Sequence, residues 1–174
     1  IDRVRAHCHL EIGMLVSAQY TEWHKKFGGG TNFHGLFNGM NLIGADAARC
    51  FVDHKANPEL QFSQFIASTP VYFKVAIPSS GTPDFVKRHP WIARGTAAGA
   101  KSWEISFSAT GLPVAFSPSQ REVAETVLTT VRPSTVPHRY LTRGLVTGEG
   151  SRAELTNSGK QLVSLLTEDF PLTQ

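Results

Sequence analysis

Residues 101–116 read Lys-Ser-Trp-Glu-Ile-Ser-Phe-Ser-Ala-Thr-Gly-Leu-Pro-Val-Ala-Phe, and this stretch decides the fold class of the chain. Polar and apolar residues alternate in its first half, so its large side chains would share one face of a strand: Trp103, Ile105 and Phe107. An Ala-Thr-Gly turn ends at Gly111, and residues 112–116 return as a partner strand. The stretch therefore predicts an antiparallel hairpin, and with it a sheet of several antiparallel strands.

The sequence before this hairpin supplies elements of both kinds. Residues 61–67 and 70–77 are rich in Phe, Val, Ile and Tyr, and they predict two more strands. Residues 37–52 instead carry apolar residues at every third or fourth position, which predicts a helix with one apolar face: Phe37, Met40, Ile43, Ala47 and Phe51. Residues 1–26 are compatible with a helix or a strand. Together these patterns predict an α+β fold, with one domain over residues 1–117.

Residues 118–174 repeat the same kinds of pattern in the tail. Residues 119–128 carry a modest apolar stripe and predict a helix. Residues 151–155 and 161–170 predict two strands around a turn at 157–160. We therefore expect a helix plus hairpin extension of the same domain, or alternatively a small winged-helix module.

The composition of the 174 residues excludes several classes of protein. Hydrophobic residues make up 41% and charged residues 18%, which is enough apolar material for a packed core. Apolar runs are far shorter than the roughly 20 residues of a membrane-spanning helix. The net charge is +3 with scattered basic residues, so nucleic acid is permitted as a partner but not favoured. Cys8 and Cys50 are too few for a disulfide scaffold, and with no visible signal peptide we expect a cytoplasmic protein.

The stretch that is most informative about a possible active site is Thr31-Asn-Phe-His-Gly-Leu-Phe-Asn-Gly-Met-Asn-Leu-Ile-Gly-Ala-Asp-Ala-Ala48. A glycine-rich turn leads directly into the predicted helix, and Asp46 would lie about two turns inside it. A helix N-terminus exposes unpaired backbone N–H groups and the positive end of the helix dipole. Glycines let a substrate carbonyl approach those groups, as in an oxyanion hole, and a nearby carboxylate or His could act as base or nucleophile.

Residues 27–117 contain three features of a known family: the Asn-x-His-Gly-x-x-x-Gly turn, the Ala-Asp-Ala-Ala of the helix, and the strands that end at Ala115. Together they resemble the hotdog-fold acyl-thioesterases. The resemblance implies a central helix packed on a curved antiparallel sheet, and a homodimer with its active site between subunits. It implies an acyl-CoA or similar thioester as substrate. We expect no cofactor. The residues that it implies for the site are Asp46 as base or nucleophile, His34 and Asn32 as positioning groups, and Gly39, Met40 and Gly35 around the oxyanion.

The tail provides a hypothesis of another class. It contains three short motifs: Ser-Thr-Val at 134–136, Gly-Leu-Val at 144–146 and Leu-Thr-Asn-Ser-Gly-Lys-Gln-Leu at 155–162. With these motifs, residues 119–166 resemble a winged-helix DNA-binding domain. The resemblance implies a recognition helix, then a wing, then a final helix. Basic residues near the first two motifs could then reach phosphates or base edges: Arg132, His138, Arg139 and Arg143.

Other chemical sites have little support in the sequence. His7 and His9 would share one face of a strand, but no third ligand follows at a recognisable spacing, and a catalytic zinc needs three. The chain has no phosphate-binding Gly-rich loop, nucleophile elbow or His-Glu-x-x-His. We therefore predict no metal site. A non-catalytic ligand-binding module remains a third hypothesis.

Overall fold

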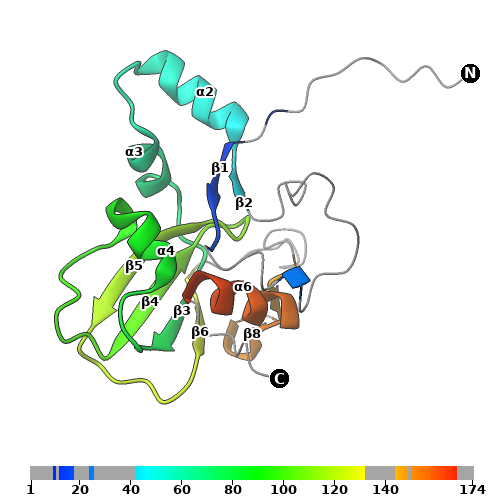
Figure 1. The fold of residues 1–174 in the computed structure, drawn as a ribbon. Helices are drawn as coiled ribbons and strands as arrows, with labels where there is room; N and C mark the ends of the chain where they lie inside the picture. Colours follow the sequence, from blue (N-terminus) through cyan, green and yellow to red (C-terminus); the bar gives the residue numbers. More distant parts are fainter. Residues whose placement is uncertain are drawn as a thin grey trace, which may run out of the picture.

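The structure, a computed structural model, has an antiparallel sheet as its largest element (Figure 1). It describes residues 10, 12–17, 24–25, 42–131, 144–148 and 150–167. The sheet has four strands in the order β5-β4-β3-β6, and each strand is antiparallel to its neighbours. The strands are β3 (Phe73–Pro78), β4 (Ser102–Phe107), β5 (Pro113–Ser119) and β6 (Val127–Thr130). The predicted α+β class is confirmed.

The β4–β5 hairpin is the element that the sequence predicts best. Its register pairs Ile105 with Phe116, and a register shift lies between Ser106 and Phe107. The turn contains Gly111 at φ 79°, a conformation that L side chains rarely adopt. The predicted strand at 70–77 is also confirmed, as β3, although it begins at Phe73.

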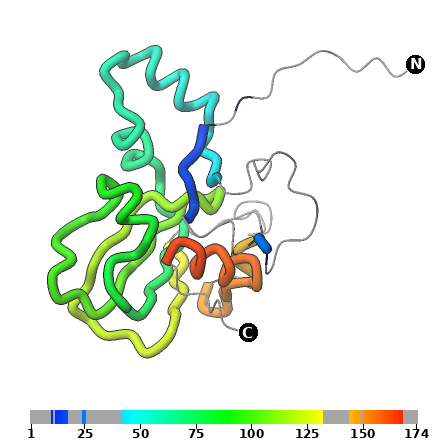
Figure 2. The backbone as a smooth tube through the Cα atoms, viewed as in Figure 1, coloured from blue at the N-terminus to red at the C-terminus, as the bar shows by residue number. Residues whose placement is uncertain are grey.

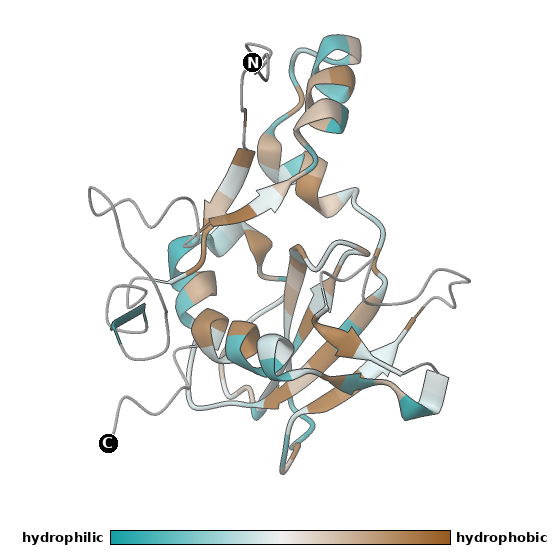
Figure 3. Cartoon of the chain, turned by 90° about the vertical axis from the view of Figure 1, so that its right-hand side faces the viewer, coloured by the Kyte–Doolittle hydropathy of each residue, from teal (hydrophilic) through white to brown (hydrophobic). Residues whose placement is uncertain are grey.

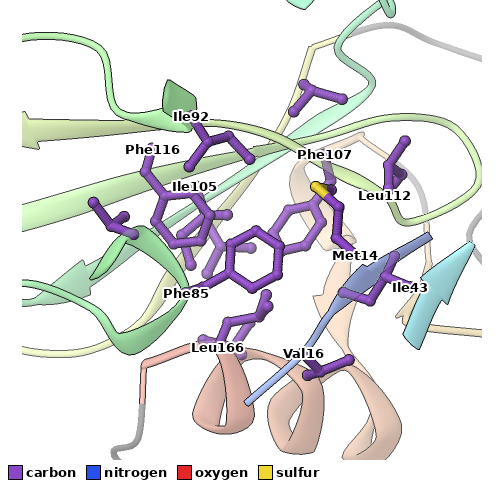
Figure 4. Close-up of a cluster of buried hydrophobic side chains, with 14 of the residues drawn as sticks. Met14, Val16, Ile43, Phe85, Ile92, Ile105, Phe107, Leu112, Phe116 and Leu166 are labelled. Carbon is purple, nitrogen blue, oxygen red and sulfur yellow. The ribbon is translucent and has the colours of Figure 1, made fainter. Parts of the chain in front are cut away.

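One face of the sheet carries the hydrophobic core (Figure 4). Short helices supply the facing side chains: Phe85 from α4 (Asp84–Arg88), Ile92 from η3 (Pro90–Ile92) and Leu166 from α6 (Asn157–Thr167). The rings of Phe85 and Phe116 stack at 5.6 Å between centroids. The described part of the tail therefore contributes to the same core as the sheet.

A second, two-stranded sheet packs against the core. In it β1 (Ile12–Leu15) pairs with β2 (Leu42–Ala45), and both strands bury a residue against the core, Met14 and Ile43. From β2 the chain runs into α2 (Ala47–Ala56) and returns to the main sheet through α3 (Phe62–Ala67), as Figure 2 shows.

The helix expected at 37–52 differs from the observed structure. Residues 42–45 are a strand and the helix begins only at Ala47, while residues 37–41 lie outside the described residues. No residue of α2 is fully buried, and the helix stands apart from the main sheet (Figure 3). The expectation of a central helix on the sheet is therefore wrong for this segment. The aspartate at 46 accounts for the late start, because Asp is a preferred N-cap residue.

Two further segments have the opposite structure to the one predicted. Residues 62–67 form α3 rather than a strand, since Phe62, Phe65 and Ile66 have helical spacing and Gln61 forms a capping box with Gln64. Residues 119–128, predicted as a helix, contain the end of β5 and the start of β6. In β6 the β-branched residues favour a strand.

The tail also differs from the predicted hairpin. A short hairpin forms earlier, between β7 (Val146–Thr147) and β8 (Glu154–Leu155), with the turn η4 (Gly150–Arg152) between them. The predicted strand at 161–170 is helical through Thr167, and residues 168–170 lie outside the described residues. The described order is thus hairpin and then helix. None of the described helices has both the length and the apolar character needed to cross a membrane.

Candidate functional site

Asp46 is the one predicted site residue that the structure describes, and its position differs from the expected one. It is the N-cap of α2, with φ −70° and ψ 95°, and not a residue two turns inside a helix. The other predicted site residues lie outside the described residues: Asn32, His34, Gly35, Gly39 and Met40. Asp46 is therefore the residue around which the candidate site lies.

The two carboxylate oxygens of Asp46 have different environments. Oδ1 accepts a hydrogen bond from the backbone N–H of Arg49 at 3.0 Å, which is the usual capping interaction. Within the described chain no group donates to Oδ2, and the side chain is exposed. One oxygen of this carboxylate thus holds the helix end, and the other can accept a proton from water or a ligand.

The first backbone N–H groups of α2 lie beside this carboxylate. The first helical hydrogen bond joins Cys50 N to Asp46 O at 2.9 Å. The amides of Ala47 and Ala48 precede this bond, so they have no acceptor within the helix. They present partial positive charge next to the Asp46 side chain. This end of α2 therefore combines two hydrogen-bond donors with a carboxylate.

A cleft of about 340 Å³ opens next to Asp46. It lies between the start of α2, the α3 helix with the loop that follows it, and the β4–β5 turn. Most of the surface that lines it is apolar, and polar groups from side chains such as Asp46 and Arg49 are placed among the apolar and aromatic ones, as is typical of small-molecule sites. The lining residues are Asp46, Arg49, Phe65, Thr69, Pro70, Tyr72, Ser108, Ala109, Thr110 and Leu112.

Arg49 joins α2 to α3 and forms one wall of the cleft. Its Nη2 donates to Ser68 Oγ at 3.1 Å, and its Nε pairs with Asp53 Oδ2 at 3.3 Å. The guanidinium lies over the Phe65 ring, 5.0 Å from the centroid. These contacts hold the side chain in place and leave a positive charge at the edge of the cleft.

The β4–β5 turn forms the opposite wall. Ser108 Oγ accepts hydrogen bonds from the N–H groups of Thr110 at 3.2 Å and Leu112 at 3.1 Å. These bonds hold the Ser108 oxygen in the turn, and no described base contacts it. Ser108 therefore organises the turn and is a poor candidate for a nucleophile. Asp46 is the only carboxylate among the lining residues.

His89 has a pKa below the ordinary value of histidine. Burial lowers the pKa of its imidazole, the hydrogen bond with the Leu15 carbonyl at 3.2 Å acts in the opposite direction, and the neighbouring Arg88 charge lowers it further. The ring contacts Phe85 and Trp91 and is not part of the cleft at Asp46. Its contact with Leu15 joins the β1–β2 sheet to the core helices.

Metal ligands do not cluster in the part of the chain that the structure describes: no three His, Cys, Asp or Glu side chains lie close enough to hold an ion. His7 and His9, the pair considered in the sequence, lie outside that part, as does Cys8. Cys50 is a half-buried free thiol on α2.

Comparisons with protein-family models, with curated proteins and with solved structures found no match for the chain. Reasoning from the sequence did not identify Ala47, Ala48, Arg49 or the residues of the β4–β5 turn as neighbours of the site. The preference of Asp for the N-cap position would have located the helix start, and with it the two amides that have no acceptor within the helix.

Proposed function

We propose that the cleft binds the acyl group of an acyl thioester and that Asp46 promotes its hydrolysis. The observation that carries the proposal is a cleft with Asp46 as the only carboxylate among its lining residues, next to the N-terminus of α2, whose first two amides have no acceptor within the helix. The apolar walls formed by Phe65, Pro70 and Leu112 would hold the acyl chain. The proposal keeps the reaction that the resemblance to hotdog-fold acyl-thioesterases implies. It does not use the central helix on the sheet that the same resemblance implies.

The proposed reaction uses Asp46 Oδ2 as a general base. A water molecule loses a proton to Oδ2 while its oxygen attacks the thioester carbonyl carbon. The carbonyl oxygen becomes an oxyanion, which the amides of Ala47 and Ala48 would stabilise as hydrogen-bond donors. The carbon–sulfur bond then breaks, and the thiolate takes the proton back from Asp46. The products are a carboxylic acid and a free thiol.

Both parts of the site are expected to contribute substantially. General-base catalysis typically accelerates a reaction by about 10²–10⁴-fold, and one oxyanion donor contributes about 10²–10³-fold. Asp46→Asn separates the two contributions, because Asn caps a helix about as well as Asp but is not a base. The amides of α2 should stay in place in this variant.

The test is thiol release from a panel of acyl-CoAs with short, medium and long chains, measured with a thiol-reactive dye. We expect the parent protein to hydrolyse at least one of them, and Asp46→Asn to lose about 10²–10⁴-fold in kcat/KM. Glu59→Gln is the matched control, since Glu59 is an exposed acid just after the same helix and does not line the cleft. Equal rates in parent and Asp46→Asn would remove Asp46 from the mechanism. Ligand binding without turnover would favour the non-catalytic module.

A homodimer is part of the same proposal. Phe51 and Val52 of α2 are 53% and 67% exposed, although both are large and apolar. A second copy packed along α2 would cover them, and it would give this helix a neighbour besides α3. Light scattering should report a dimer, which Phe51→Lys weakens. A monomer at all concentrations would contradict this part of the proposal.

DNA binding by the tail is a second candidate, favoured by the order of its elements. A hairpin followed by a helix is the order that the winged-helix resemblance implies for residues 144–166. Arg152 lies exposed in the turn of that hairpin, where a wing would meet a phosphate. Fluorescence anisotropy with duplex DNA at low salt tests the idea, and Arg139→Ala with Arg143→Ala should weaken salt-dependent binding. No binding by the parent protein would refute it.

A further inference from the structure

A second cavity, of about 650 Å³, lies between the edge strand β6 and α6. It is larger than the cleft at Asp46 and shares no residue with it. Its lining comes from the end of β3, from β6 with the residues before it, from β8 and from α6: Ile77, Pro78, Glu125, Thr126, Val127, Leu128, Ala153, Glu154, Leu155, Lys160, Val163, Ser164 and Thr167. We call it the β6–α6 groove.

The two edges of the main sheet differ in how they are protected. Along β5, the segment at Ala93–Arg94 covers the edge, with a parallel bridge from Ala93 to Phe116 and a 2.7 Å hydrogen bond from Arg94 N to Phe116 O. Pro113 and Pro118 also remove donors from this strand. Along β6, no described residue pairs with the outer side. Residues 127–131 read Val-Leu-Thr-Thr-Val, without the charge or proline that usually protects an open edge.

The register of β6 shows which of its backbone groups face outward. Val131 N donates to Tyr72 O at 2.9 Å, and the same register places Thr129 opposite Lys74. Opposed residues in an antiparallel pair alternate between bonded and non-bonded pairs. The residues that bond to β3 are thus the odd-numbered ones. The N–H and C=O groups of Leu128 and Thr130 point to the open edge.

We propose that the β6–α6 groove binds an extended peptide of a partner protein, which adds to the sheet as a strand along β6. The backbone of such a peptide would bond to Leu128 and Thr130, as in other cases of strand addition to an open edge. Its alternate side chains would pack against Leu155 and Val163 across the groove. β8 and α6 form the far side of the groove, and η4 lies beside β6.

The charges around the groove indicate what kind of peptide fits. Glu125 and Glu154 are exposed at the lining, and Lys160 is the one cation there. The excess of carboxylates favours a peptide with basic residues beside its apolar ones. The partner segment is therefore expected to be extended, alternately apolar and net positive.

The first test uses backbone amide exchange in the full chain, measured by NMR. The amides of Leu128 and Thr130 should exchange at least about tenfold faster than that of Thr129, because only Thr129 donates to β3. Equal protection of all three in a monomeric sample would mean that the edge is already covered, and it would overturn the proposal. Protection that appears only with dimer formation would assign the edge to a second copy, and this result would also overturn it.

The second test adds a probe, the peptide Lys-Thr-Val-Thr-Val-Thr-Lys with blocked termini. We expect saturable binding that slows exchange at Leu128 and Thr130. Three changes should each weaken binding at least about tenfold: methylation of alternate amide nitrogens of the probe, replacement of its two Lys by Glu, and Thr130→Pro, which removes an outward N–H without breaking the ladder to β3. Thr130→Val keeps the N–H and should bind like the parent. No saturable binding, or equal binding of the methylated probe, would overturn the proposal.

Discussion

Gly159→Ala is the substitution for which the structure makes the sharpest stability prediction. Gly159 lies in the first turn of α6, where alanine would ordinarily stabilise a helix by about 1 kcal/mol over glycine. Here a Cβ atom would overlap the carbonyl oxygen of Leu145 and approach Leu155 Cδ2 to 3.0 Å. The obstacle at Leu145 is backbone, so the helix and the β7–β8 hairpin would have to move apart.

That movement disrupts the junction between the hairpin and the helix. Thr156 N donates to Leu145 O at 3.0 Å, and Thr156 Oγ1 donates to Gly144 O while it accepts from Gly159 N. Overpacking typically costs about 1–3 kcal/mol, and one lost hydrogen bond costs about 1 kcal/mol. After subtraction of the helix-propensity gain, we expect a net loss of about 1–3 kcal/mol. For a chain of this size a loss of about 2 kcal/mol lowers Tm by roughly 4–8 °C.

Urea unfolding followed by far-UV circular dichroism measures the difference. Ser158→Ala is the matched control, because Ser158 is the exposed neighbour on the same helix and should change stability by no more than about 0.5 kcal/mol. If Gly159→Ala were as stable as the parent, or more stable, helix propensity alone would decide the outcome. The close approach of α6 to Leu145 would then be refuted.

Three other substitutions test separate parts of the structure. Asp46→Ala should cost about 1 kcal/mol of stability in urea unfolding through loss of the N-cap, whereas Asp46→Asn should stay within a few tenths; equal losses would contradict the capping role. The pKa of His89 is lowered chiefly by burial, so the unfolded chain binds more protons just below the ordinary histidine value, and stability falls as the pH drops through that range. His89→Gln should flatten this slope in a pH series of thermal melts, and an unchanged slope would assign it to other groups. Phe116→Ala, which empties a fully buried site stacked on Phe85, should cost about 3–5 kcal/mol, and a loss under 1 kcal/mol would show that the site is not packed.

The sequence predicts the elements whose signal is local. The β4–β5 hairpin is recognisable because its alternation and its turn glycine lie within one short stretch of chain. The strand β3 is recognisable from its run of β-branched and aromatic residues. Both signals concern single elements. The neighbour of β3 on its other side is β6, about 50 residues later, and no local pattern indicates that pairing.

Other elements were mispredicted because two patterns competed. The segment at 62–67 is rich in strand-forming residues, but its apolar spacing and the Gln61–Gln64 capping box favour a helix. Residues 161–167 were predicted as a strand, although Val163 and Leu166 are three positions apart and both are buried on one side of α6. In each case packing against the core decides whether the segment is a helix or a strand. The sequence alone does not show which residues form that core.

The candidate site was predicted only through Asp46. Its cleft is assembled from the start of α2, the α3 segment and the β4–β5 turn, and its lining runs along the sequence from Asp46 to Leu112. Tertiary packing brings these segments together, so spacing along the chain could not identify Arg49 or Leu112 as its walls. The expected position of Asp46 inside a helix was wrong because residues 42–45 form a strand.

The central claim is that the end of α2 at Asp46 receives the carbonyl group of an acyl thioester. The most direct measurement is an NMR titration of the full chain with a non-hydrolysable acyl-CoA analogue, in which a methylene group replaces the thioester sulfur and the carbonyl is kept. The account predicts saturable shifts of the amides of Ala47 and Ala48, together with residues of the cleft such as Leu112. Saturable binding that leaves both amides unshifted, or no binding of any chain length, would contradict it.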